Sequence, residues 1–148
     1  MTEIIKIVIT GSFGYCHVDE AFNDKLSITP DSISYEYIPM VESELNPHRK
    51  WRYKTNSPVF KKQFETVTVL MKDVVEKDTD MFCTDIGDIG FNITDSDKTR
   101  FKETFWLPAD EFKDQFKKIK KMVHSCEYTP VVLMTSEDYE EMEDDENV

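Results

Sequence analysis

The chain has 148 residues, of which 39% are hydrophobic, 12% aromatic and 32% charged. This length and apolar content suffice for one domain with its own core, and they exclude a chain that is disordered throughout. The formal net charge is −12, and residues 137–148 contribute eight acidic residues and no basic one. We therefore expect a single domain over residues 1–136 and a disordered acidic tail over residues 137–148.

The first half of the chain has the patterns of four strands. Residues 3–10 are rich in β-branched residues, with apolar residues at both parities, which predicts a strand buried on both faces. Glycines follow it, and we interpret them as a tight turn and loop. Residues 25–39 alternate around Thr29-Pro30-Asp31-Ser32, which predicts a β-hairpin. Residues 51–55 predict another strand, with one apolar and one polar face.

Two amphipathic helices are predicted, and their apolar residues stand at matching offsets. Serine is favoured at the N-cap of a helix and proline at its first position, so Ser57-Pro58 predicts the start of a helix. The segments "FKKQFETVTVLM" from Phe60 and "FKDQFKKIKKMV" from Phe112 each place apolar residues on one helical stripe. A hairpin over residues 88–107 precedes the second helix, as strands precede the first.

These elements predict an α+β fold. We expect tandem β-β-α units, a pseudo-repeat of residues 25–76 and 86–124, that form a mainly antiparallel sheet with two helices packed on one face. Chance similarity between two Phe- and Lys-rich helices is the alternative explanation of the repeat. A short apolar run at residues 131–134 predicts a closing edge strand.

The strand aromatics are the candidate binding residues. If part of the sheet is uncovered, they would form an aromatic contact surface, because tyrosine and tryptophan are enriched at the centres of protein interfaces. A place in the core is the competing interpretation for each of them. The candidates are Tyr35, Tyr37, Trp51, Tyr53 and Trp106.

No motif predicts a catalytic residue, a metal site or a cofactor. Cys16-His17 and His124-Ser125-Cys126 lack the spacing of a metal motif, and a thiol enzyme using Cys16 with His17 or His124 remains an alternative. The glycines after the first strand do not match the phosphate-binding templates. Asp95 and Asp97 resemble the start of a calcium loop, but Arg100 stands where that loop needs glycine.

The sequence therefore favours a non-enzymatic interaction or regulatory module that binds a protein through the sheet face or a sheet edge, with a homodimer also possible. Basic clusters occur near residues 49–54 and 113–121, but the net negative charge disfavours nucleic acid as the partner. An acidic inhibitor that mimics nucleic acid is an alternative. Three cysteines without disulfide spacing and the absence of a membrane-length apolar run favour the cytoplasm.

Overall fold

The computed structural model describes residues 2–13, 20–78, 87–125 and 127–146. Six strands form one antiparallel sheet in the order β4-β3-β2-β1-β5-β6. The strands are β1 (Ile4–Phe13), β2 (Phe22–Thr29), β3 (Ser32–Pro39), β4 (Arg49–Lys54), β5 (Asp88–Asp95) and β6 (Arg100–Phe105). The N-terminal strand therefore lies inside the sheet, and β4 and β6 form its edges.

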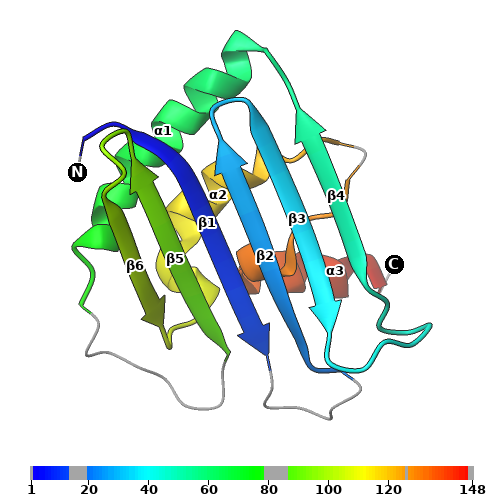
Figure 1. The fold of residues 1–148 in the computed structure, drawn as a ribbon. Coiled ribbons are helices and arrows are strands. Elements are labelled where there is room, and N and C mark those ends of the chain that lie inside the picture. The colour runs from blue at the N-terminus through cyan, green and yellow to red at the C-terminus, as the bar shows by residue number, and fades with distance from the viewer. Residues whose placement is uncertain (1, 14–19, 79–86, 126, 147–148) are drawn as a thin grey trace.

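All the helices lie on one side of this sheet, so the molecule has two layers (Figure 1). The helices are α1 (Pro58–Val75), η1 (Ala109–Phe112), α2 (Lys113–Lys120), η2 (Val131–Leu133) and α3 (Ser136–Glu146), where η marks a 3-10 helix. The predicted α+β class, with an antiparallel sheet and helices on one face, is confirmed.

Helix α1 forms where the sequence predicts it. The side chain of Ser57 accepts a hydrogen bond from the amide of Val59 at 3.2 Å, and Pro58 fills the first turn. The apolar stripe that faces the sheet is fully buried and consists of Phe60, Phe64, Val67, Met71 and Val74. Helix α2 is shorter, with 8 residues against 18, and it buries Phe116 and Ile119.

The tandem β-β-α repeat is not confirmed. The hairpins β3-β4 and β5-β6 lie at opposite edges and each precedes a helix, but β1 and β2 separate them and belong to neither unit. The predicted burial of β1 on both faces is wrong, because Ile7 and Ile9 are buried whereas Thr10 on the other face is exposed. The strand also continues through Gly11 to Phe13, where the sequence predicts a turn.

The C-terminal segment differs from the predictions. The predicted edge strand over residues 131–134 is wrong, because this segment forms η2 and pairs with no strand. A helix stands where a disordered tail is predicted, since α3 covers Ser136–Glu146. At its start the amide of Thr135 donates to Asp138 Oδ2 at 2.9 Å, which is one of the two hydrogen bonds of a capping box. Local capping thus supports a helix that composition alone disfavours.

Candidate functional site

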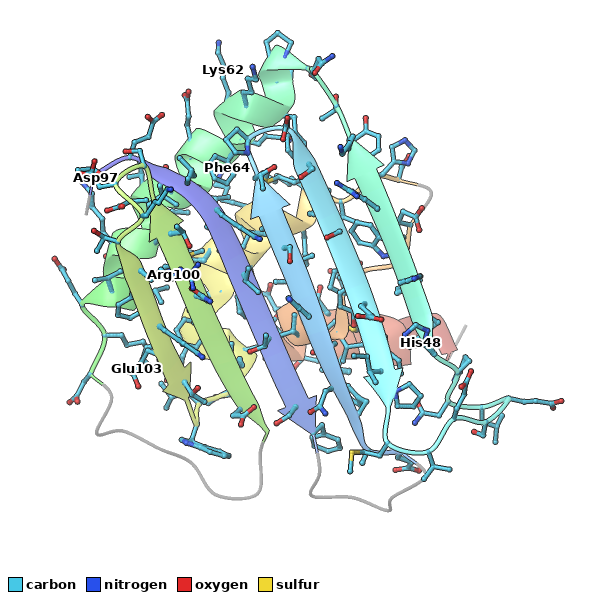
Figure 2. The ribbon with its side chains drawn as sticks, in the orientation of Figure 1. His48, Lys62, Phe64, Asp97, Arg100 and Glu103 are labelled. Atoms are coloured by element: carbon cyan, nitrogen blue, oxygen red, sulfur yellow. The ribbon has the colours of Figure 1, made fainter. Side chains whose placement is uncertain are left out.

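One face of the sheet carries no helix, and alternate residues of all six strands point towards it (Figure 2). In β1, Ile7 and Ile9 point into the core, so Lys6, Val8 and Thr10 point to the uncovered side. The same alternation holds in the other strands. The strand register aligns these residues in rows, and one row crosses the sheet as Arg52, Ser34, Ser27, Val8, Asn92 and Lys102.

This uncovered face is basic although the protein is acidic. Its two acidic side chains are Glu36 and Asp88. Its seven basic side chains, which define what we call the basic face, are Lys6, Lys25, Lys50, Arg52, Lys54, Arg100 and Lys102. A positive surface on a chain with a net charge of −12 requires that the acids lie elsewhere. The face therefore differs in sign from the molecule as a whole.

The cations of the basic face outnumber its acids by seven to two. Within the described residues, none of the seven forms an ion pair, although Glu36 is the cross-strand neighbour of two of them. Glu36 Oε2 lies 2.8 Å from Nε2 of His48, and Asp88 Oδ1 accepts a hydrogen bond from Ser12 Oγ at 2.6 Å. The two carboxylates therefore offset only part of the positive charge, and the face keeps an excess of cations.

The predicted aromatic contact surface is not on the uncovered face. Tyr35, Tyr37 and Trp51 are only 2%, 6% and 8% exposed, because their parity in β3 and β4 turns them towards the helices. Tyr53 has the same parity, is half-buried and packs against the ring of Phe60. The sequence shows correctly that these residues share a face, but that face is the covered one.

Trp106 is the predicted binding residue whose side chain is exposed to solvent. It follows the end of β6 and is 44% exposed, while its neighbours Phe105 and Leu107 are buried. It does not adjoin the four other candidates, which lie on or beside the opposite edge strand β4. The structure therefore does not bring the five candidate aromatics together.

A second polar cluster lies on the covered side, where sequence analysis found no candidate. Asp24 is 2% exposed, and its Oδ2 accepts hydrogen bonds from Tyr35 Oη at 2.7 Å and from the amide of Val132 at 2.9 Å. Tyr35 Oη in turn accepts from the amide of Val131 at 3.1 Å. The two side chains therefore join η2 to the sheet. Asp24, Leu26 and Ile28 are alternate residues of β2 and therefore lie on the same face of the sheet. This spacing is the sequence signal that the carboxyl of Asp24 points into the core.

Burial raises the pKa of the Asp24 carboxyl, and the hydrogen bonds from Tyr35 and Val132 offset this only in part. Oδ1 is buried and has no hydrogen-bond partner within the described residues, although the amide of Gly11 faces the carboxyl. A Cβ at Gly11 would collide with this oxygen, which makes glycine necessary there. Beside the cluster lies a largely apolar cavity of about 320 Å³, bordered by Phe22, Val132 and Tyr139 among others.

The other sequence candidates form no site in the described part of the chain. Cys16, His17 and Cys126 lie outside the described residues. The ring of His124 lies 4.9 Å from the ring of Tyr53. Asp95 closes the β5-β6 turn by accepting hydrogen bonds from the amides of Asp97 and Thr99, which explains the calcium-like pattern without a metal.

The described residues form neither a metal-ion cluster nor a membrane-spanning helix. Among the described residues, no three His, Cys, Asp or Glu side chains converge in a way that would hold a metal ion. None of the described helices combines the length and apolar character needed to span a membrane. No protein-family model matches the chain, and no curated protein is similar to it.

Proposed function

We propose that the protein is a non-enzymatic interaction module that binds a protein partner through the basic face of its sheet. The observation that supports this proposal is the contrast between the two faces, one covered by helices and the other uncovered and lined with cations that form no ion pair within the described residues. An excess of like charges destabilises the free protein slightly and favours association with an oppositely charged surface.

The dimensions of the face suit a protein partner. Six strands at a spacing of about 4.8 Å, each at least 6 residues long, give a surface of about 25 Å by 20 Å. This area of about 500 Å² is somewhat less than the roughly 800 Å² that each partner buries in a standard protein interface. With its surrounding loops, the face is large enough for one specific but reversible contact.

The side chains of the face favour binding over catalysis. The face offers cations, hydroxyls, two carboxylates and the amides of Asn23 and Asn92, and its central residues include Thr10 and Ser27. His48, at its margin, hydrogen-bonds Glu36 and contacts no serine hydroxyl. Ser12 Oγ donates to the carboxylate of Asp88 at 2.6 Å, but the described residues place no imidazole at this pair, so a Ser-His-Asp arrangement is not formed there. We propose a cytoplasmic location for this module, because its three cysteines lack the spacing of a disulfide framework.

Site-specific photocrosslinking tests the proposal. A photoreactive side chain is placed at Ser27, at the centre of the basic face, or at Lys62, which is exposed on α1 (Figure 2). In native cell extract we expect a discrete protein adduct from the Ser27 position and none from the Lys62 position. Equal adducts from both positions, or adducts from Lys62 alone, would contradict the proposal.

A truncation after Ser136 separates the proposal from the alternative of an acidic inhibitor. The truncated chain keeps the basic face and loses the acidic part of α3. If the partner binds the face, the Ser27 adduct persists in the truncated chain. If the adduct disappears and the partner instead binds full-length chain through α3, charge mimicry replaces the proposed function.

A further inference from the structure

We infer that the partner of the basic face is a folded acidic protein surface whose carboxylates contact two separate groups of cations at once. The inference rests on the proposed function, and it adds the chemistry and the minimum width of the partner's surface. It depends on how the seven cations are distributed over the six strands.

Five of the seven cations form two groups at opposite edges of the face. The β4 group consists of Lys50, Arg52 and Lys54, and the β6 group consists of Arg100 and Lys102. The two remaining cations, Lys25 on β2 and Lys6 on β1, lie between these groups. From β4 to β6 there are five strand spacings, or about 24 Å. One compact anionic group cannot bridge that distance.

Apart from Lys25 and Lys6, most side chains between the two groups are small. Ser27, Val8 and Asn92 are consecutive in the central row, and in the next row Thr10 pairs with Gly90. Gly90 leaves bare backbone beside the hydroxyls of Thr10 and Thr104. A smooth floor of this kind admits the close approach of a folded surface and offers hydroxyl and amide groups to its polar atoms.

The composition of the face favours carboxylates over a nucleic acid. In the described chain, the strands β1 to β6 direct no aromatic side chain to the uncovered side, and Trp106, directly after β6, adds a single exposed ring at its margin. The face therefore has no row of rings on which successive bases could stack. A nucleic acid that extends beyond the basic face would also meet a molecule with a net charge of −12. An acidic protein patch of limited width gains the attraction without that repulsion.

The acidic helix of the chain itself does not occupy the basic face. Helix α3 lies on the covered side (Figure 1). Asp138 Oδ2 lies 2.6 Å from Nζ of Lys120, and the hydroxyl of Ser136 donates to Asp110 at 2.7 Å. These contacts hold the start of α3 against α2 and η1, away from the cations. Among the described residues, no segment outside the sheet covers the basic face, so we assign its occupant to another molecule.

Two glutamate peptides and an oligonucleotide test the inference. A peptide of 20 glutamates can reach both groups when extended, whereas a peptide of six glutamates extends only about 20 Å and reaches one. The phosphate probe is oligo-dT of 20 nucleotides. Binding is measured by fluorescence anisotropy at low and moderate salt, with full-length protein.

Three double variants distinguish the groups. Lys50→Glu with Arg52→Glu reverses the β4 group, and Arg100→Glu with Lys102→Glu reverses the β6 group. The matched control, Lys61→Glu with Lys62→Glu, makes the same change in net charge at exposed positions in the first turns of α1. Circular dichroism and thermal unfolding confirm that each variant is folded.

We expect the longer glutamate peptide to bind at least about tenfold more tightly than the shorter one, because both groups contribute. Reversal of either group should weaken its binding by about tenfold or more, while the control changes it by about twofold or less. Tighter binding of oligo-dT than of the longer peptide would overturn the choice of carboxylates. An effect confined to one group would overturn the two-group arrangement. Neither result affects the Ser27 crosslink, which tests the proposed function separately.

Discussion

The two faces of the same sheet have opposite compositions, although consecutive residues of each strand contribute to both. The covered face contains Ile7, Ile9, Leu26, Ile28 and Phe91, all at most 1% exposed. The uncovered face contains cations, hydroxyls and amides. Stability therefore resides mainly in one set of alternate residues and recognition, in our proposal, in the other set. Substitutions on the covered face should lower stability, whereas substitutions on the uncovered face should change binding and leave stability nearly unchanged.

The largest effect is expected from a cavity in the covered face. Phe116 is fully buried, and its ring centroid lies 5.7 Å from that of Phe112 and 6.2 Å from that of Phe91. Phe116→Ala should lower the free energy of unfolding by about 3 to 5 kcal/mol, measured by urea denaturation. Thr104→Ala on the uncovered face should change it by about 0.5 kcal/mol or less. Similar losses in both variants would break the contrast between the faces.

Asp24 is the polar exception on the covered face, and its removal should have the next largest effect. Asp24→Ala leaves the hydroxyl of Tyr35 and the amide of Val132 without their acceptor. The loss of two buried hydrogen bonds should cost about 2 kcal/mol of unfolding free energy. The matched acid on the other face is Glu36, and Glu36→Ala should cost about 0.5 kcal/mol or less. Equal costs would show that η2 does not depend on Asp24.

The pH dependence of stability sharpens the assignment of Asp24. Burial raises its pKa above the ordinary value of 3.8, so the folded state binds the proton more tightly than the unfolded state. The stabilisation from this proton is complete below pH 3.8 and is lost as pH rises through the folded pKa. Asp24→Asn does not titrate and should become more stable relative to wild type between pH 4 and pH 7.

Asp110 and Asp138 have lowered pKa values and therefore stabilise the fold as pH rises. Hydrogen bonds from Ser136 cause the shift of Asp110; at Asp138 burial opposes the shift, and hydrogen bonds from Lys120 and Thr135 outweigh it. The pH-dependent contributions of Asp110 and Asp138 to stability are the same in wild type and in Asp24→Asn. They therefore cancel when the unfolding free energies of the two proteins are subtracted. A stability difference that stays constant from pH 4 to pH 7 would contradict the raised pKa of Asp24.

The smallest predicted effect concerns the start of α1, the longest element over the covered face. Ser57→Ala removes the acceptor of the Val59 amide and should lower the unfolding free energy by about 1 kcal/mol. Ser57→Asp supplies a carboxylate in the same place and should restore the loss. If Ser57→Ala and Ser57→Asp are equally stable, the cap observed here contributes nothing measurable.

The local elements were predictable because their signals lie within short segments. The α1 stripe from Phe60 to Val74, its Ser57 cap and the β2-β3 hairpin all follow from spacing and turn residues. The mistake about β1 has a longer-range origin. Apolar residues at both parities suggested burial on two faces, but Ile5 lies beside the irregularity between Ile4 and Lys6 and is 40% exposed.

The candidate site could be predicted only in part because it depends on strand order. The alternation of Lys50, Arg52 and Lys54 indicates a polar face of β4 from sequence alone. The β6 group joins the same face only because β1 pairs with both β2 and β5, and no local pattern indicates that pairing. The exposed aromatic surface was expected because the sequence does not show which side of β3 and β4 the helices cover.

The central place of β1 also determines the order in which the fold can be completed. The backbone groups along one edge of β1 form hydrogen bonds with β2, which follows closely in the chain. Those along the other edge pair with β5, where Ile7 lies opposite Ile93, and β5 is synthesised much later. At translation rates of about 5 to 20 residues per second, residues 14–87 add several seconds to this delay. During this time, the β1 edge with Ile7 and Ile9 is open to other nascent chains, so molecular chaperones that cover such edges should increase the yield of folded protein.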